Sequence, residues 1–269
     1  MPSRKQIEAT ARGMIEIMFP VSDTGAKFEG GGPSLRGALW LLLGATVAVG
    51  GVVALRVLVS GRLGYAILGW NLMLAWVPLL LALAANRQHR ASAGSNWRFL
   101  GLSALWLLFF PNAPYIFTDL VHLNTWFRGH YWIDLAMISM TALTGFVLGF
   151  LSLFLMQSIV SSRHGWKAGW VFVITVSGLA GLGVYLGRFL RWNSWDAALH
   201  PFGISRDVFN LAAHPMAHAR HLEFQAAFGM FLLLGYMVLY AMTQLAPSPG
   251  AATGIGGPRG LPQRNRDSD

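Results

Sequence analysis

The stretch FFPNAPYIFTDLVHL, residues 109–123, interrupts an apolar run with two prolines and then continues with an aspartate and a histidine. Apolar runs of roughly 20 residues recur along the chain, and an α-helix of that length crosses a hydrocarbon core about 30 Å thick. A second stretch, GRFLRWNSWD at residues 187–196, ends another such run with charged and aromatic residues. We therefore expect membrane-spanning helices whose polar chemistry is concentrated in these two stretches.

The composition supports a protein embedded in a membrane. Of the 269 residues, 54% are hydrophobic and only 12% are charged, and the mean hydropathy is +0.49. A soluble domain of this size needs far more charge on its surface. We predict an all-α polytopic transmembrane helical bundle, in which each span satisfies its own backbone polar groups. The absence of cysteine excludes disulfides and thiolate ligands or nucleophiles.

The predicted domain organisation places six spans between two non-spanning segments. Residues 1–36 suit a short amphipathic helix at the membrane interface, and residues 246–269 form a basic, disordered cytoplasmic tail. The transmembrane domain covers residues 37–245 and includes an extracytoplasmic loop at residues 191–223. The predicted spans are residues 38–59, 66–85, 97–118, 133–159, 168–190 and 224–245.

The basic residues indicate how the chain is oriented. Most of the 20 basic residues fall in the tails and in the loops on the same side as the tails. The positive-inside rule then places both termini in the cytoplasm and the protein in the cell membrane. The net charge of +9 favours attraction to anionic lipid over nucleic-acid binding. In this orientation the two polar stretches lie in the same outer leaflet.

Asp119 and His122 are the candidate catalytic residues. If residues 115–123 are helical, the two side chains share a face, with Tyr115 one turn before Asp119. The aspartate can fix the imidazole tautomer for general acid/base work, or the pair can hold part of a metal site. In the alternative interpretation, Asp119 forms an internal ion pair with Arg188 or Arg191, because acidic and basic residues at the membrane edge pair readily.

Pro111 and Pro114 allow two interpretations. Prolines remove backbone donors and break a helix, which exposes carbonyls that can bind a ligand, as in the interrupted helices of transporters. The interpretation we favour is that the break marks the end of the third span, because the preceding run is already long enough to reach the interface.

The second stretch supplies the candidate ligand-binding residues. Arg188 and Arg191 share a helical face and can bind a phosphate or carboxylate through forked hydrogen bonds. An internal salt bridge to Asp119, Asp134 or Asp196 is the alternative. The complete predicted ligand-binding set is Asn112, Tyr115, Arg188, Arg191, Asn193 and Asp196.

Three histidines, His214, His218 and His221, are spaced to share one helical face and can in principle bind zinc or copper. The spacing matches no zinc motif with a mechanistic basis, and a basic helix on the outer surface accounts for it equally well. We therefore predict no metal site, and no cofactor is identified.

The residues 110–122 (FPNAPYIFTDLVH), 145–152 (GFVLGFLS) and 187–196 together resemble DUF1361, a family of uncharacterised bacterial and archaeal membrane proteins. The resemblance covers about residues 65–240, and its first and last motifs are long. It implies a multi-span membrane protein with a polar outer region and no assigned activity. The first 36 residues, the basic tail and the three histidines lie outside it.

Three functions remain open. The leading hypothesis is an outer-leaflet polar site that binds an anionic lipid headgroup or a small polar ligand, with a membrane-embedded hydrolase or transferase as its catalytic form. The second is a small-solute transporter, although no inverted repeat is detected and no charge lies near the middle of a span. The third is a scaffold or accessory subunit whose charges form internal salt bridges. The oligomeric state is not predicted.

Overall fold

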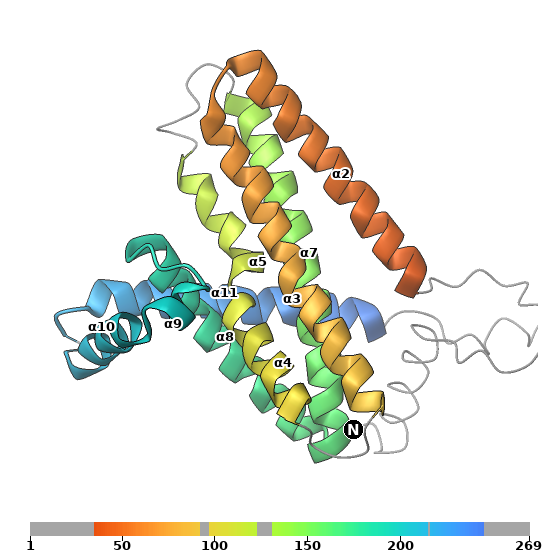
Figure 1. The fold of residues 1–269 in the computed structure, drawn as a ribbon, viewed down its shortest axis with the longest axis vertical. Helices are drawn as coiled ribbons and strands as arrows, with labels where there is room; N and C mark the ends of the chain where they lie inside the picture. The colour runs from red at the N-terminus through yellow and green to blue at the C-terminus, as the bar shows by residue number, and fades with distance from the viewer. Residues whose placement is uncertain (1–34, 92–96, 123–130, 215, 245–269) are drawn as a thin grey trace, which may run out of the picture.

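The computed structural model describes residues 35–91, 97–122, 131–214 and 216–244, and within these ranges the regular secondary structure is entirely helical. Most of the expected interfacial segment at residues 1–36 and the whole tail at residues 246–269 lie outside the described residues. Figure 1 shows the arrangement of the described helices. In chain order the elements are α2 (Leu35–Ser60), η1 (Leu63–Tyr65), α3 (Ala66–Ala91), α4 (Trp97–Phe109), α5 (Asn112–Tyr115), η2 (Ile116–His122), α7 (Tyr131–His164), α8 (Trp166–Phe189), α9 (Asp196–Leu199), α10 (Pro201–Ala213) and α11 (Ala219–Gln244).

Six segments of the described chain are long and apolar enough to cross a membrane, which confirms the predicted all-α, six-span class. Their bounds are Gly37–Ser60, Leu63–Ala91, Trp97–Val121, Tyr131–His164, Trp166–Phe189 and Ala219–Thr243. The sixth helix begins five residues before the predicted residue 224, and the expected loop at 191–223 contains the helices α9 and α10. Apolar run length predicts the spans well and the helix ends less well, because polar residues can extend a helix beyond the hydrocarbon core.

The third span is broken in its interior. The helix α4 ends at Phe109, but the chain continues through α5 and η2 along the same span, which extends to Val121 (Figure 1). The favoured interpretation that the prolines mark the end of the span is therefore wrong. Pro111 and Pro114 have no N–H to donate to the preceding turn, so the helix cannot continue in regular form.

The broken segment packs closely against α7. Ala113 is fully buried, and a Cβ atom added at Gly145 would lie 2.8 Å from its carbonyl oxygen. At Gly149 an added Cβ would lie 3.0 Å from the Ala113 side chain. Only glycine permits this approach, so the GxxxG spacing of the fourth span is a close helix contact, as predicted.

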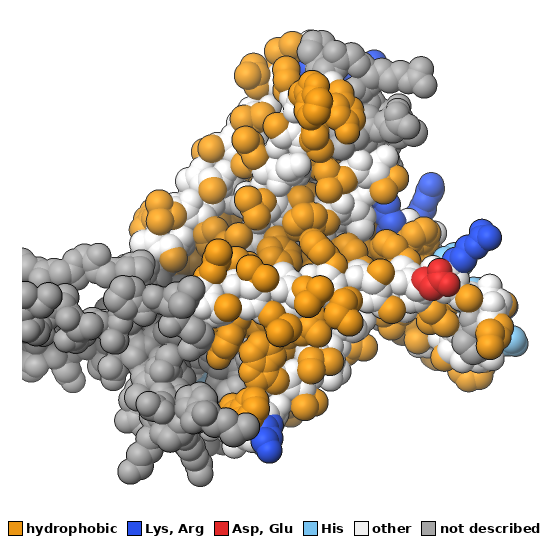
Figure 2. Space-filling model, turned by 180° about the vertical axis from the view of Figure 1, so that it is seen from behind, with side chains coloured by type: hydrophobic (Ala, Val, Ile, Leu, Met, Phe, Trp, Pro, Cys, Tyr) orange, Lys and Arg blue, Asp and Glu red, His pale blue; other side chains and the backbone are white. Residues whose placement is uncertain are grey.

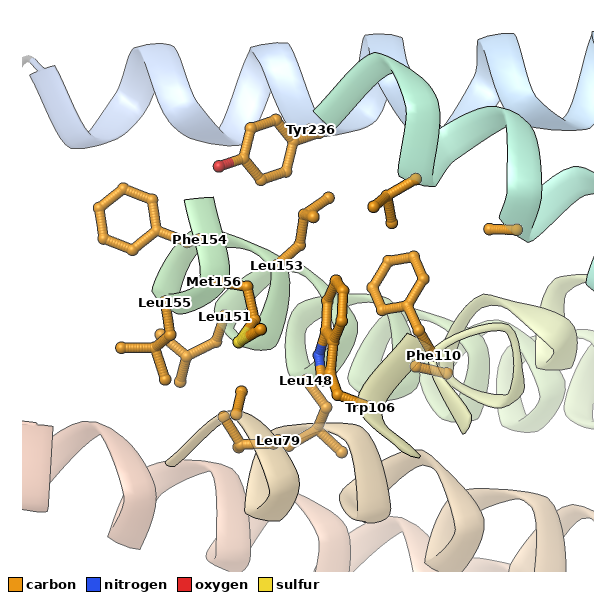
Figure 3. Packing of buried hydrophobic residues seen from close by; sticks show 14 of the residues in the cluster. Leu79, Trp106, Phe110, Leu148, Leu151, Leu153, Phe154, Leu155, Met156 and Tyr236 are labelled. Atoms are coloured by element: carbon orange, nitrogen blue, oxygen red, sulfur yellow. The ribbon is translucent and has the colours of Figure 1, made fainter. Parts of the chain in front are cut away.

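The apolar core surrounds α7, the longest helix. Figure 3 shows Trp106 and Phe110 of the third span between Leu79 of α3 and Tyr236 of α11. Trp106 is 1% exposed, and its indole N–H donates to Ser152 Oγ at 3.3 Å. The four spans thus meet in one buried cluster, which fixes the position of the broken segment.

The outer surface is apolar in the manner of a lipid-facing protein. In Figure 1, α11 runs across the direction of α3 and α7, and the side of the molecule that it covers carries many hydrophobic side chains in Figure 2. Exposed apolar residues on this helix include Met230, Leu234, Val238 and Met242. A surface this apolar is stable in a bilayer and would aggregate in water.

Candidate functional site

The two polar stretches meet, as the sequence predicts. The Arg188 guanidinium at the end of α8 donates to Asp119 Oδ1 in η2 at 3.2 Å, and the two residues form an ion pair. Asp119 is only 4% exposed. An unpaired carboxylate this deeply buried would be costly, so the pairing stabilises both the third and the fifth span in this arrangement.

A third span contributes to the same cluster. The Asn71 amide of α3 donates to Asp119 Oδ2 at 2.9 Å. Both carboxylate oxygens therefore accept a hydrogen bond from another helix. Sequence reasoning missed Asn71 as a site residue, although a lone amide in an apolar span is a signal of an internal polar contact. We call Asn71, Asp119 and Arg188 the Asp119 network.

The proline break itself is held by the second stretch. The Asn112 amide donates to Ser194 Oγ at 3.0 Å, and the Ser194 hydroxyl donates to the Leu108 carbonyl at 3.1 Å. Leu108 lies in the last turn of α4, where the break leaves carbonyls without helical partners. Ser194 therefore replaces a missing helix hydrogen bond, and Asn112 acts in this contact as a structural residue.

Two glycines of α8 allow the broken segment to lie against that helix. A Cβ atom added at Gly183 would lie 2.5 Å from the Pro111 ring. At Gly187 an added Cβ would lie 3.3 Å from the Tyr115 ring. Tyr115 therefore packs against Gly187 at the end of α8, and Gly187 directly precedes Arg188.

Arg191 differs from Arg188 in its surroundings. It is exposed, and the structure shows no ion pair or hydrogen bond between its side chain and the described residues. Its φ is +62°, the left-handed conformation that usually favours glycine or asparagine after a helix. The Trp192 backbone N–H donates to the Leu186 carbonyl at 3.1 Å, and this hydrogen bond caps the end of α8. The expected salt bridge from Arg191 to an acidic residue is absent among the described residues.

Asn193 and Asp196 form a local turn. Asp196 Oδ2 accepts the Asn193 backbone N–H at 2.7 Å and its amide at 3.2 Å. The other carboxylate oxygen lies 3.8 Å from His200 Nδ1. Asp196 therefore fixes the start of α9 and does not join the Asp119 network. The following helix α10 is attached through the Trp192 indole, which donates to Asp207 at 2.9 Å.

The candidate histidines His214, His218 and His221 do not share one helix. His122 ends η2, but its side chain lies outside the described residues, so its catalytic role stays a prediction. His214 follows the last residue of α10, and His218 precedes α11, so the expectation of one helix face carrying His214, His218 and His221 is wrong. Among the described residues no cluster of three possible metal ligands occurs.

A second buried carboxylate, Asp134, has a partner that the sequence analysis did not identify. Asp134 at the start of α7 is fully buried and accepts two hydrogen bonds from Arg56 of α2, at 2.8 and 3.1 Å. The Tyr65 hydroxyl donates to the same carboxylate at 3.1 Å. Asp134 therefore pairs with Arg56 rather than with Arg188 or Arg191, the partners considered from the sequence. We call these three residues the Asp134 network.

The fold and these contacts define an all-helical membrane protein whose spans are joined by buried ion pairs. Residues 70–235 match the family described as a protein of unknown function, DUF1361. The chain belongs to this family. The matched range includes the whole Asp119 network but, of the Asp134 network, only Asp134. It also includes the three histidines, so their expected exclusion from the resemblance is wrong. No curated protein and no solved structure matches the chain.

Proposed function

We propose that the protein binds an anionic headgroup at Arg191, on a surface held in place by the Asp119 network. The observation that carries this proposal is the contrast between two arginines three residues apart. Arg188 is paired within the protein, whereas Arg191 projects an exposed guanidinium with no ion-pair partner among the described residues. A planar guanidinium suits the oxygens of a phosphate, to which it can donate two hydrogen bonds.

The backbone at Arg191 supports a functional role. The left-handed conformation costs a non-glycine residue about 1–2 kcal/mol. The residue that adopts it after a helix is usually glycine, but here it is an arginine. Strained backbone positions of this kind concentrate at binding sites. A positive side chain at a helix C-terminus also stabilises the helix dipole, and this effect is the structural alternative.

The neighbouring residues suit a site at headgroup depth. Trp192 and Trp195 follow Arg191 closely, and tryptophans are enriched where lipid headgroups meet the hydrocarbon core. The amide of Asn193 uses one N–H for Asp196, and an amide has two, so it can supply a further donor. We assign Asp119, Arg188, Asn112, Tyr115 and Asp196 to positioning this surface.

The location of the site follows from the charge distribution. The basic tails and the loops on the same side favour a cytoplasmic location of both termini in the cell membrane. The end of α8 then lies in the outer leaflet. Its ligand is accordingly the headgroup of an anionic phospholipid or a free phosphate-bearing solute on the outer side.

The experiment compares the full-length protein with the variants Arg191→Gly and Arg206→Gln in nanodiscs of phosphatidylcholine with increasing phosphatidylglycerol. Arg206 is an exposed arginine of α10 and serves as the charge-matched control. Native mass spectrometry counts the retained phosphatidylglycerol. We expect Arg191→Gly to weaken retention about tenfold because it removes the guanidinium donors. Arg206→Gln should leave retention nearly unchanged.

Parallel titrations with inorganic phosphate distinguish the two sources of ligand. Binding of free phosphate that is lost in Arg191→Gly indicates a soluble ligand, whereas phosphatidylglycerol retention alone indicates a lipid. Unchanged binding of both in Arg191→Gly contradicts the proposal. That result would favour the scaffold, because the complete pairing of Asp119 and Asp134 within the protein is what a purely structural role predicts.

A further inference from the structure

The helices α8 and α11 pack antiparallel in a regular register. Tyr185 of α8 lies against His221 of α11 with ring centroids 5.1 Å apart, and Trp170 lies against Tyr236 with centroids 6.1 Å apart. Between these ends, Gly181 faces Gln225 and Ser177 faces Gly229. From Tyr185 to Ser177, every step of four residues along α8 is matched by a step of four along α11, so the same two faces stay in contact.

The two backbones approach closely at the glycines. A Cβ atom at Gly181 would clash with the Gln225 carbonyl oxygen, and one at Gly229 would lie 3.0 Å from the Ser177 carbonyl oxygen. We call this contact the α8–α11 seam, and its members are Ser177, Gly181, Tyr185, His221, Gln225 and Gly229. Ser177, His221 and Gln225 place polar side chains along this contact, and in membrane proteins such side chains usually form hydrogen bonds between the helices.

Three buried polar atoms of the seam have no hydrogen-bond partner among the described residues. They are Ser177 Oγ, Gln225 Nε2 and His221 Nδ1. Ser177 is 2% exposed. A buried polar group without a partner is costly, and such groups in proteins are commonly satisfied by ordered water. That all three occur along a single helix contact indicates one shared cause.

Their positions form a line. His221 lies in the first turn of α11, beside Phe189 at the end of α8, with ring centroids 5.9 Å apart. Gln225 lies one turn further along α11, and Ser177 lies at the middle of α8, which covers Trp166–Phe189. The line therefore leads from the end of the fifth span to its centre.

We propose that the α8–α11 seam binds a file of water molecules that bridges His221, Gln225 and Ser177 and reaches the middle of the fifth span. A serine hydroxyl donates and accepts, a glutamine amide donates, and the histidine nitrogen does either according to its tautomer, so a bridging water finds complementary partners at each step. The seam is independent of the headgroup site, and it supplies the hydrated polar position at mid-span that a transport function requires.

Cysteine reactivity tests this proposal directly, because the chain contains no cysteine of its own. Thiosulfonate reagents react with the thiolate, which forms only where water reaches the sulfur. We compare full-length Ser177→Cys with Ala180→Cys, both reconstituted in phosphatidylcholine vesicles and treated with a small cationic methanethiosulfonate. Ala180 is 1% exposed and packs in the apolar core of the same helix, which makes it the matched control.

We expect Ser177→Cys to react at least about tenfold faster than Ala180→Cys, with Gln225→Cys, nearer the end of the seam, faster still. Equal rates for Ser177→Cys and Ala180→Cys overturn the proposal. If Ser177→Cys fails to fold, Gln225→Cys takes its place in the comparison. In that case a rate equal to that of Ala180→Cys rejects a hydrated seam, and a rate at least about tenfold faster supports it.

Discussion

The two buried carboxylates, Asp119 and Asp134, are paired in different ways. Asp134 is fully buried, accepts two hydrogen bonds from one guanidinium and accepts a third from the Tyr65 hydroxyl. The Arg56 guanidinium also lies 5.2 Å from the Tyr65 ring centroid. Asp119 accepts one hydrogen bond of 3.2 Å from Arg188 and one from an uncharged amide.

This difference separates two roles for an ion pair in a membrane. A forked arginine–carboxylate pair fixes both distance and orientation. In the Asp134 network this pair joins the first and fourth spans, and Tyr65 adds the second. The looser pair of Asp119 with Arg188 joins the third and fifth spans, and Asn71 adds the second. Arg188 lies three residues before the exposed Arg191. We infer that the Asp134 network is structural and that the Asp119 network positions a binding surface.

The largest expected effect is on Asp134. Asp134→Ala leaves the largely buried Arg56 side chain without its carboxylate, and the breaking of a buried pair costs about 3–5 kcal/mol. Thermal unfolding of the detergent-solubilised protein measures the loss. The control is Glu223→Ala, an exposed carboxylate at the start of α11. A loss no greater than that of the control would remove the structural role that we assign to the Asp134 network.

A smaller loss is expected from Asp119→Ala in the same assay. It removes one hydrogen bond from a charged donor and one from an amide, and together these contribute about 2–3 kcal/mol. The loss should be smaller than that of Asp134→Ala because Asp119 accepts one hydrogen bond from Arg188, whereas Asp134 accepts two from Arg56. If Asp119→Ala is the more destabilising variant, the ranking of the two networks is reversed.

A still smaller effect on stability than that of Asp119→Ala, and one of opposite sign, is expected from Arg191→Gly. Glycine adopts the left-handed backbone without strain, so this variant should gain about 1 kcal/mol even as headgroup retention falls. Arg206→Gly, within the helix α10, should instead lose about 0.5–1 kcal/mol, because glycine is unfavourable in a helix interior. Destabilisation by Arg191→Gly would show that its side chain has a structural role.

The spans and the meeting of the two polar stretches could be predicted from sequence because few charges interrupt the apolar runs. Asp119 and Arg188 end spans that leave the membrane on the same side, and a buried charge must find an opposite one. Their pairing follows from those two constraints. The interior break of the third span was misjudged, because run length alone does not show whether the chain continues across the membrane beyond a proline.

The remaining contacts depend on which helices are neighbours, and a single sequence does not specify that. Arg56 and Asp134 are 78 residues apart, and nothing in the sequence marks them as partners. Ser194 is an ordinary polar residue until the break at Pro111 leaves a carbonyl of α4 in need of a donor. Asn71 had a usable signal, since an amide within an apolar span seeks an internal partner.

A double-mutant cycle on Asp119→Asn and Arg188→Gln tests the central claim, that a buried ion pair between the third and fifth spans holds this surface in place. Unfolding free energies of the two single variants and the double variant give the coupling between the two side chains. We predict a coupling of about 1–3 kcal/mol. Losses that add to within about 0.5 kcal/mol would show that the two side chains do not interact, and would contradict that claim.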